Sequence, residues 1–121
     1  MSASQRRKGA AAEREVLKLL ADELGAAPFQ RNLEQTRNGG ADCIEVQGFA
    51  IEVKRQERLS RPAWWAQAVD QARRAQAEPM LLYRRSREPW RALIHTMDGG
   101  YREATFDQAV AHIREKWARW P

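Results

Sequence analysis

Hydrophobic positions in the first quarter of the chain recur with the period of an α-helix. Large apolar side chains three or four residues apart would form one stripe on this helix: Val16, Leu17, Leu20 and Leu24. Ser4 can cap the start of the helix, and Gly25 can end it. Glu13 falls within the apolar stripe and is therefore expected to point toward the core and not toward solvent.

A β-hairpin is predicted in residues 39–57, where the turn decides which side chains share a face. A two-residue turn at 47–48 would place Asp42 on the face away from Glu52. A three-residue loop at 46–48, whose last residue is a glycine able to adopt the left-handed region, would bring Asp42 opposite Glu52. We predict the three-residue loop, because it separates the apolar residues of the second strand from one mostly charged face: Asp42, Ala50, Glu52 and Lys54.

The remaining pattern predicts a helix, two strands and a last helix. The helix and the two strands are expected at 62–77, 79–85 and 89–96. A turn follows at 98–100, and Thr105 and Gln108 form a capping box for the last helix. The predicted order is therefore α-β-β-α-β-β-α, in a single domain spanning residues 1–121. This order indicates an α/β fold with a mixed central β-sheet flanked by helices.

Charge is distributed unevenly along a composition that is otherwise ordinary for a globular protein. The chain carries a net charge of +5, and residues 55–91 alone hold nine arginines against four acidic residues. Arginine presents a planar fork that suits phosphate oxygens, so a polyanion is the expected partner, although a solvated charged surface is also compatible. The longest apolar runs are too short to span a membrane and no secretory signal is recognisable, so we expect a cytoplasmic protein.

Three carboxylates and a lysine are predicted to converge. Glu13, Asp42 and Glu52 would repel one another, and a divalent cation is the usual way to make such an arrangement favourable. Oxygen ligands without a suitable Cys/His cluster favour magnesium or manganese over zinc. Lys54 projects from the same strand face as Glu52 and could stabilise the negative charge that develops on a phosphoryl group attacked by water.

Each residue of this set also has an explanation without catalysis. Glu13 could pair with Arg37 or Lys54, and Asp42 could simply cap a turn after two glycines. Glu52 and Lys54 could form an ordinary ion pair. The combination is more specific than its parts, because it follows a fixed order along the chain.

The stretches KGAAAERE, GGAD and IEVK, in this order and spacing, resemble the PD-(D/E)xK nuclease superfamily. They are most similar to the archaeal-type Holliday junction resolvases and the related small nucleases of bacteriophages, over residues 8 to about 95. The resemblance implies a restriction-endonuclease-like fold, Mg²⁺ as cofactor with Mn²⁺ as a substitute, and cleavage that leaves a 5′-phosphate. It implies Lys54 and, more weakly, Gln71 as catalytic residues beside four metal ligands: Glu13, Asp42, Glu52 and the carbonyl group of Val53.

Two departures from the superfamily pattern are present. Ala41 stands where the superfamily has its proline, a change that many relatives tolerate. RNLEQTRNGG takes the place of a serine-bearing loop, and this second departure bears on substrate preference. Residues from this stretch and from the end of the second predicted strand are expected to contact DNA: Arg31, Asn32, Gln35, Arg37, Arg55 and Arg58.

These expectations combine into one function. We predict a Mg²⁺-dependent DNA endonuclease that cuts Holliday or other branched junctions and works as a homodimer, in the host cytoplasm if it is encoded by a phage. A nucleic-acid-binding module without catalysis and a general nuclease of linear duplexes are the alternatives. An α/β enzyme acting on a phosphate metabolite is disfavoured, because the chain has no glycine-rich phosphate loop.

Overall fold

The computed structural model describes residues 3–34 and 40–119 of the 121-residue chain, with side chains from Lys8 onward. Its elements follow the order α-β-α-β-β-β-α: α1 (Ala3–Leu24), β1 (Phe49–Arg55), α2 (Arg61–Ala75), β2 (Glu78–Arg84), β3 (Arg91–His95), β4 (Tyr101–Thr105) and α3 (Phe106–Ala118). No helix in the described part of the chain is long and apolar enough to cross a membrane.

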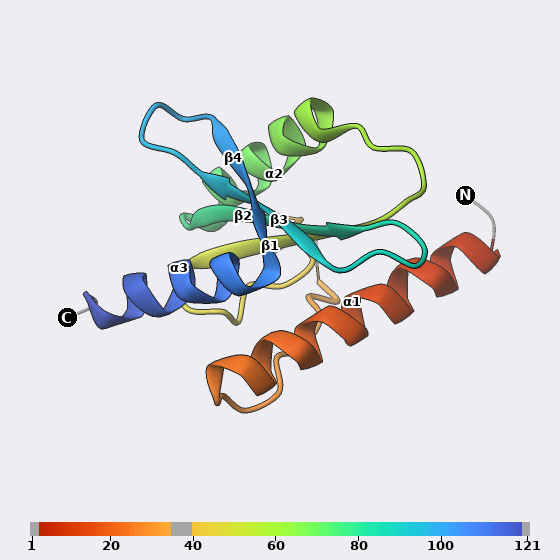
Figure 1. Ribbon diagram of the computed structural model, residues 1–121, viewed down its shortest axis with the longest axis horizontal. Helices are drawn as coiled ribbons and strands as arrows, with labels where there is room; N and C mark the ends of the chain where they lie inside the picture. Colours follow the sequence, from red (N-terminus) through yellow and green to blue (C-terminus); the bar gives the residue numbers. More distant parts are fainter. Residues whose placement is uncertain (1–2, 35–39, 120–121) are drawn as a thin grey trace.

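The four strands form one mixed sheet in the order β1-β2-β3-β4. β1 and β2 are parallel and are joined through α2, whereas β2, β3 and β4 pair antiparallel with their neighbours in sequence. Helices α1 and α3 lie on one face of the sheet and α2 lies on the other (Figure 1). The predicted α/β class, with a mixed central sheet between helices, is confirmed.

Alternating side chains of the strands supply a core on each face of the sheet. The face under α1 and α3 buries Phe49, Ile51, Val53, Met80, Leu82, Ala92 and Ile94. The face under α2 buries Ala50, Leu81, Tyr83 and Leu93. In β1, therefore, the odd-numbered residues are committed to the larger core, and the even-numbered residues, which include Glu52 and Lys54, share the side of α2.

Local signals mark two helix ends where the sequence predicted, whereas Ser4, the expected cap of α1, lies inside that helix, which already begins at Ala3. Gly25 ends α1 with φ +65°, and the amide of Ala26 donates to the carbonyl of Ala21 at 2.9 Å. The capping box of α3 is formed in both directions, with Thr105 N donating to Gln108 Oε1 at 2.9 Å and Gln108 N donating to Thr105 Oγ1 at 3.1 Å. Local hydrogen bonds thus close the C-terminal end of α1 and the N-terminal end of α3.

The predicted first strand of the hairpin does not form, but the register predicted between this segment and β1 is correct. Cys43 and Ile51 form an isolated antiparallel bridge, and residues 40–48 make no further ladder with β1. This bridge places Asp42 opposite Glu52, and Gly48 adopts the left-handed region at φ +85°. The ladder stops because the carbonyl group of Ala41, the next one able to pair with β1, accepts instead from the side-chain amide of Asn32 at 2.9 Å, and the amide of Val53 donates to the Asp42 carboxylate.

Strand β4 was not predicted. Its five residues, YREAT, include only one buried side chain, Ala104, so the hydrophobic signal is too weak to mark a strand. The tight turn at 98–100, which was predicted, reverses the chain and brings β4 beside β3. β4 is then an exposed edge strand, and such strands are commonly short and polar.

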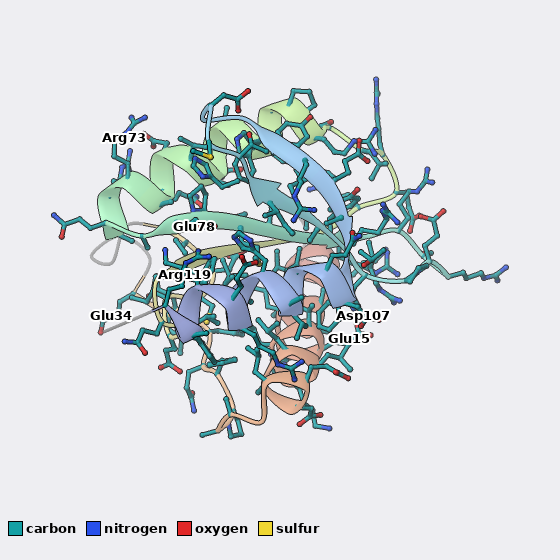
Figure 2. All side chains as sticks on the ribbon, turned by 60° about the vertical axis from the view of Figure 1, so that its left-hand side comes forward. Glu15, Glu34, Arg73, Glu78, Asp107 and Arg119 are labelled. Atoms are coloured by element: carbon teal, nitrogen blue, oxygen red, sulfur yellow. The ribbon has the colours of Figure 1, made fainter. Side chains whose placement is uncertain are left out.

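Glu78 ties α3 to the start of β2. Its Oε2 lies 2.6 Å from His112 Nε2, and its Oε1 accepts from Lys116 Nζ at 3.3 Å. Lys116 also donates to the carbonyl group of Gly48 at 3.2 Å, next to the start of β1. Figure 2 shows Glu78 between the sheet and α3. These contacts hold the end of β1 that lies away from its charged residues.

The docking of α1 on the sheet can be tested with two leucines of the same helix. Leu17 is 1% exposed in the core and Leu19 is 40% exposed. We expect Leu17→Ala to lower the free energy of unfolding by about 2–5 kcal/mol, because it leaves a cavity under α1. Leu19→Ala should cost less than about 1 kcal/mol. Urea denaturation of both variants measures the difference, and equal losses would contradict the burial of this stripe.

Candidate active site

The candidate site forms at the outer edge of β1, where the segment that precedes β1 in the chain stops pairing with it. The amide and carbonyl groups of Ile51 both bond to Cys43, at 2.9 and 3.1 Å. Two residues further on, the amide of Val53 faces the same edge and donates to Asp42 Oδ2 at 2.7 Å. A carboxylate thus replaces a backbone carbonyl as the partner of β1, and the carbonyl group of Val53 faces the edge where this carboxylate lies.

Three carboxyl groups meet at this edge. Asp42 and Glu52 are each only 6% exposed, and Glu13 reaches them from the middle of α1. The carboxyl groups of Glu13 and Glu52 each lie close enough to that of Asp42 to interact with it. The structure therefore brings each of the two glutamates next to Asp42, which lies between them.

Burial and mutual repulsion shift the pKa values of these acids upward. Burial raises the pKa of Glu52 to about 9, and the negative charge of Asp42 adds to the shift while Lys54 opposes it. Burial also raises the pKa of Glu13, with Asp42 acting in the same direction and Arg31 in the opposite one. With all three acids ionised, the site would hold more negative charge than its surroundings stabilise.

Two cationic side chains lie against the acids. Arg31 Nε donates to Glu13 Oε2 at 2.5 Å, and Lys54 Nζ lies 3.9 Å from Glu52 Oε1. Sequence reasoning offered Arg37 or Lys54 as the partner of Glu13, and the structure gives Arg31 that place. Arg37 lies outside the described residues.

The helix α2 contributes two amide side chains, Gln67 and Gln71. Lys54 Nζ donates to Gln67 Oε1 at 3.2 Å. Gln71, one turn further on and predicted as a catalytic residue, has a buried Oε1 without a hydrogen-bond partner in the described part of the chain. The role of Gln67 was missed, although its spacing from Gln71 on one helix face could have indicated that both approach β1.

The oxygen atoms at this edge suit a hard divalent cation. Besides Gln71 Oε1, the buried Oε2 of Glu52 has no hydrogen-bond partner among the described residues. Carboxylate and carbonyl oxygens are the ligands that Mg²⁺ and Mn²⁺ prefer. Among the described residues, no three Asp, Glu, His or Cys side chains converge closely enough to hold a metal ion as they stand. The chemistry of these oxygen atoms therefore fits such an ion. In this structure Arg31 and Lys54 supply the positive charge beside the acids.

Comparison with known proteins identifies the family. Residues 4–118 match a family described as "Phage putative PDDEXK endonuclease". The chain belongs to this family. It is also similar in structure to Hjc, a Holliday junction resolvase of the archaeal hyperthermophile Archaeoglobus fulgidus, with a TM-score of 0.54 and 20% sequence identity over 84% of this chain and 97% of that chain. This likeness shows a shared fold. No match was found among curated proteins.

Two of the residues expected to contact DNA at the PDDEXK site are engaged within the protein before β1. Arg31 is paired with Glu13, as described above. The side-chain amide of Asn32 donates to the carbonyl group of Ala41 at 2.9 Å, and its backbone amide bonds to Asp42. Asn32 thus holds the segment that carries the central carboxylate. Gln35 is outside the described residues, so its expected role is untested.

After β1, Arg55 and Arg58 differ in their surroundings. Arg55 donates to Glu57 Oε1 at 3.1 Å and to Ser86 Oγ at 3.0 Å, which joins the loop after β1 to the loop after β2. The hydrogen bonds from Ser86 and Arg55 lower the pKa of the exposed Glu57 to about 2, so the Glu57 carboxylate stays charged at neutral pH. Arg58 lies exposed in the loop between β1 and α2, where a phosphate could reach it.

The raised pKa of Glu52 predicts an unusual dependence of stability on pH. Between the ordinary value of 4.5 and about 9, the folded protein holds a proton on Glu52 that the unfolded chain has released. Without metal, this group therefore makes the free energy of unfolding fall as pH rises through that window.

We expect the melting temperature of the PDDEXK protein in EDTA to fall between pH 5 and pH 9, and Glu52→Gln to flatten that slope, because glutamine does not titrate. Glu23→Gln, at an exposed position of α1, serves as the matched control and should keep the slope. An unchanged slope in Glu52→Gln would mean that Glu52 is not the titrating group.

Proposed function

We propose that this PDDEXK endonuclease hydrolyses phosphodiester bonds of DNA with Mg²⁺ as its cofactor, and that it selects four-way or other branched junctions. The observation that carries the proposal is the placement of buried Asp42 opposite buried Glu52 at the edge of β1, with Lys54 beside Glu52. Burying like charges together is unfavourable for the fold alone, which supports a role that requires them.

The metal ion would be held by oxygen atoms from two elements. Glu52 and the carbonyl group of Val53 come from β1, Asp42 comes from the segment beside it, and Glu13 comes from α1. When bound, such an ion acts as a Lewis acid on a phosphate oxygen and makes a coordinated water more acidic. The chain's own contribution is to keep four oxygen ligands on one edge while most of the surrounding water is excluded.

Lys54 and Gln71 have distinct roles in this proposal. The ammonium group of Lys54, held between Glu52 and Gln67, stabilises the negative charge that grows on the phosphoryl oxygens as water attacks phosphorus. Gln71 presents a buried carbonyl oxygen that can accept a hydrogen bond from the attacking water and orient it. The bond between phosphorus and the 3′ oxygen, opposite the water, breaks. The 3′ oxygen takes up a proton from solvent and leaves as a hydroxyl group, and the phosphate remains on the 5′ end of the other product strand.

Two features support a branched substrate. The solved structure described above is that of a Holliday junction resolvase with nearly the same extent of chain. Residues 55–91 hold the excess of arginines, and several of these arginines lie in the loops that follow β1 and β2, at the end of the sheet that carries the site. Their position suits a substrate contacted on more than one arm. A binding module without catalysis is less favoured, because every position expected for catalysis holds the residue that the chemistry requires.

The substrate can be tested with an end-labelled four-way junction beside a linear duplex of the same arm sequence, with Mg²⁺ and with EDTA. We expect Mg²⁺-dependent cuts at symmetric positions in the junction only. Lys54→Ala should lower the cleavage rate by about 100-fold or more, because it removes one stabilising charge. Arg102→Ala, on the far edge of the sheet, controls for the loss of one cation.

Equal cutting of both DNAs would show that the protein is a general nuclease without selection for junctions. Binding of both without cutting would favour the non-catalytic module.

Symmetric cutting of a junction also requires two active sites, and one domain of this size offers one. We expect the wild-type protein to sediment as a homodimer in analytical ultracentrifugation, and one dimer to bind one junction. A monomer at the concentrations that cut the junction, with cuts in only one strand, would contradict this part of the proposal.

A further inference from the structure

Arg31 occupies a place at the site that neither the predicted DNA contact nor an ordinary surface ion pair explains. Its guanidinium donates to Glu13 at 2.5 Å, and both side chains are largely shielded from solvent, with 30% of Arg31 and 15% of Glu13 exposed. Glu13 is one of the proposed metal ligands and contacts the central carboxylate, Asp42. Arg31 therefore neutralises a residue that a metal ion would also require.

A guanidinium and a divalent ion cannot share Glu13 without cost. Both are cations, and within a few ångströms of each other in a partly buried site their repulsion is strong, because solvent screens it poorly. Binding of the ion at Glu13 thus favours movement of the Arg31 side chain away from it.

The backbone beside Arg31 is nevertheless fixed. Asn32 bonds to the carbonyl group of Asp42 at 2.7 Å and, through its side chain, to that of Ala41 at 2.9 Å. A released Arg31 side chain would therefore stay beside Asp42, where a phosphate group bound at the metal would lie. The fork of arginine is suited to accept that phosphate as its new partner.

We infer that Arg31 is an exchangeable counter-ion, which neutralises Glu13 in the metal-free protein and transfers to a DNA phosphate when a divalent ion binds. The inference rests on the proposed function and adds a coupling to it: metal binding makes one more cation available to DNA, so each of the two ligands strengthens the binding of the other.

The first test measures metal binding alone. Calorimetric titration of the DNA-free protein with Mg²⁺ and with Mn²⁺ should give at least about tenfold tighter binding for Arg31→Gln than for the wild type, because a competing charge is removed. Arg31→Met, a second neutral variant, guards against a folding defect in the first, and melting in EDTA reports folding. Arg102→Gln, on β4 at the opposite edge of the sheet from β1, should leave metal affinity unchanged.

The second test measures the coupling. In a Lys54→Ala background, which prevents cleavage, Mg²⁺ should strengthen junction binding, and adding Arg31→Gln should abolish most of that gain. Arg58→Gln, an exposed arginine outside the proposed exchange, should weaken binding by the same factor with and without Mg²⁺.

Unchanged or weaker metal binding in both neutral Arg31 variants would overturn the inference, because the arginine would then stay beside the ion. A Mg²⁺-dependent gain that survives Arg31→Gln would overturn it too. If the wild type cleaves the junction but substitution of Arg31 changes neither metal affinity nor the Mg²⁺-dependent gain in junction binding, only the exchange is rejected. Tighter metal binding in the variants with no cleavage by wild type would reject the proposed function and retain the exchange.

Discussion

The hydrogen bond from the amide of Val53 to the carboxylate of Asp42 is the interaction on which the site depends. It ends the short pairing between the loop segment and β1, and it seats Asp42 among the buried residues. Through the same register it places Glu52 opposite Asp42 and Lys54 one step beyond. A shift of one residue would move Glu52 and Lys54 onto the face that buries Phe49, Ile51 and Val53, so the large core under α1 fixes the chemistry at the edge.

Gathering acids at this edge is unfavourable for the metal-free fold. Glu52 keeps an oxygen without a donor among the described residues, and the pKa values of Glu13 and Glu52 are raised by burial and by Asp42. Arg31 and Lys54 offset part of this cost, each against a different acid. The remaining charge is stabilised only by a further cation or by protons. Stability and metal affinity are therefore opposed at the site, and a cation that binds the folded state stabilises it in turn.

The sequence predicts those parts of the site that local rules determine. The left-handed Gly48 and the alternation in β1 gave the correct register, and the apolar stripe of α1 placed Glu13 inward. The partner of Glu13 was not predictable, because it depends on the path of the connection between α1 and β1, where no periodic pattern operates. The absent first strand had a similar cause: Asn32, eleven residues before Cys43, binds the carbonyl group of Ala41 with its side-chain amide and so removes the next backbone partner of β1.

The site is therefore built from a fixed part and an adaptable part. Asp42, Glu52 and Val53 are held by the register of β1, and the backbone on both sides of them is bonded to neighbouring segments. The charged groups of Arg31 and Lys54 are held by side-chain contacts, to Glu13 for Arg31 and to Glu52 and Gln67 for Lys54, which can be exchanged without moving the backbone. In the proposed function, this arrangement would let a metal ion and a phosphate take the place of the internal ion pairs, so that the charge of the site stays balanced in both states without a rearrangement of the fold.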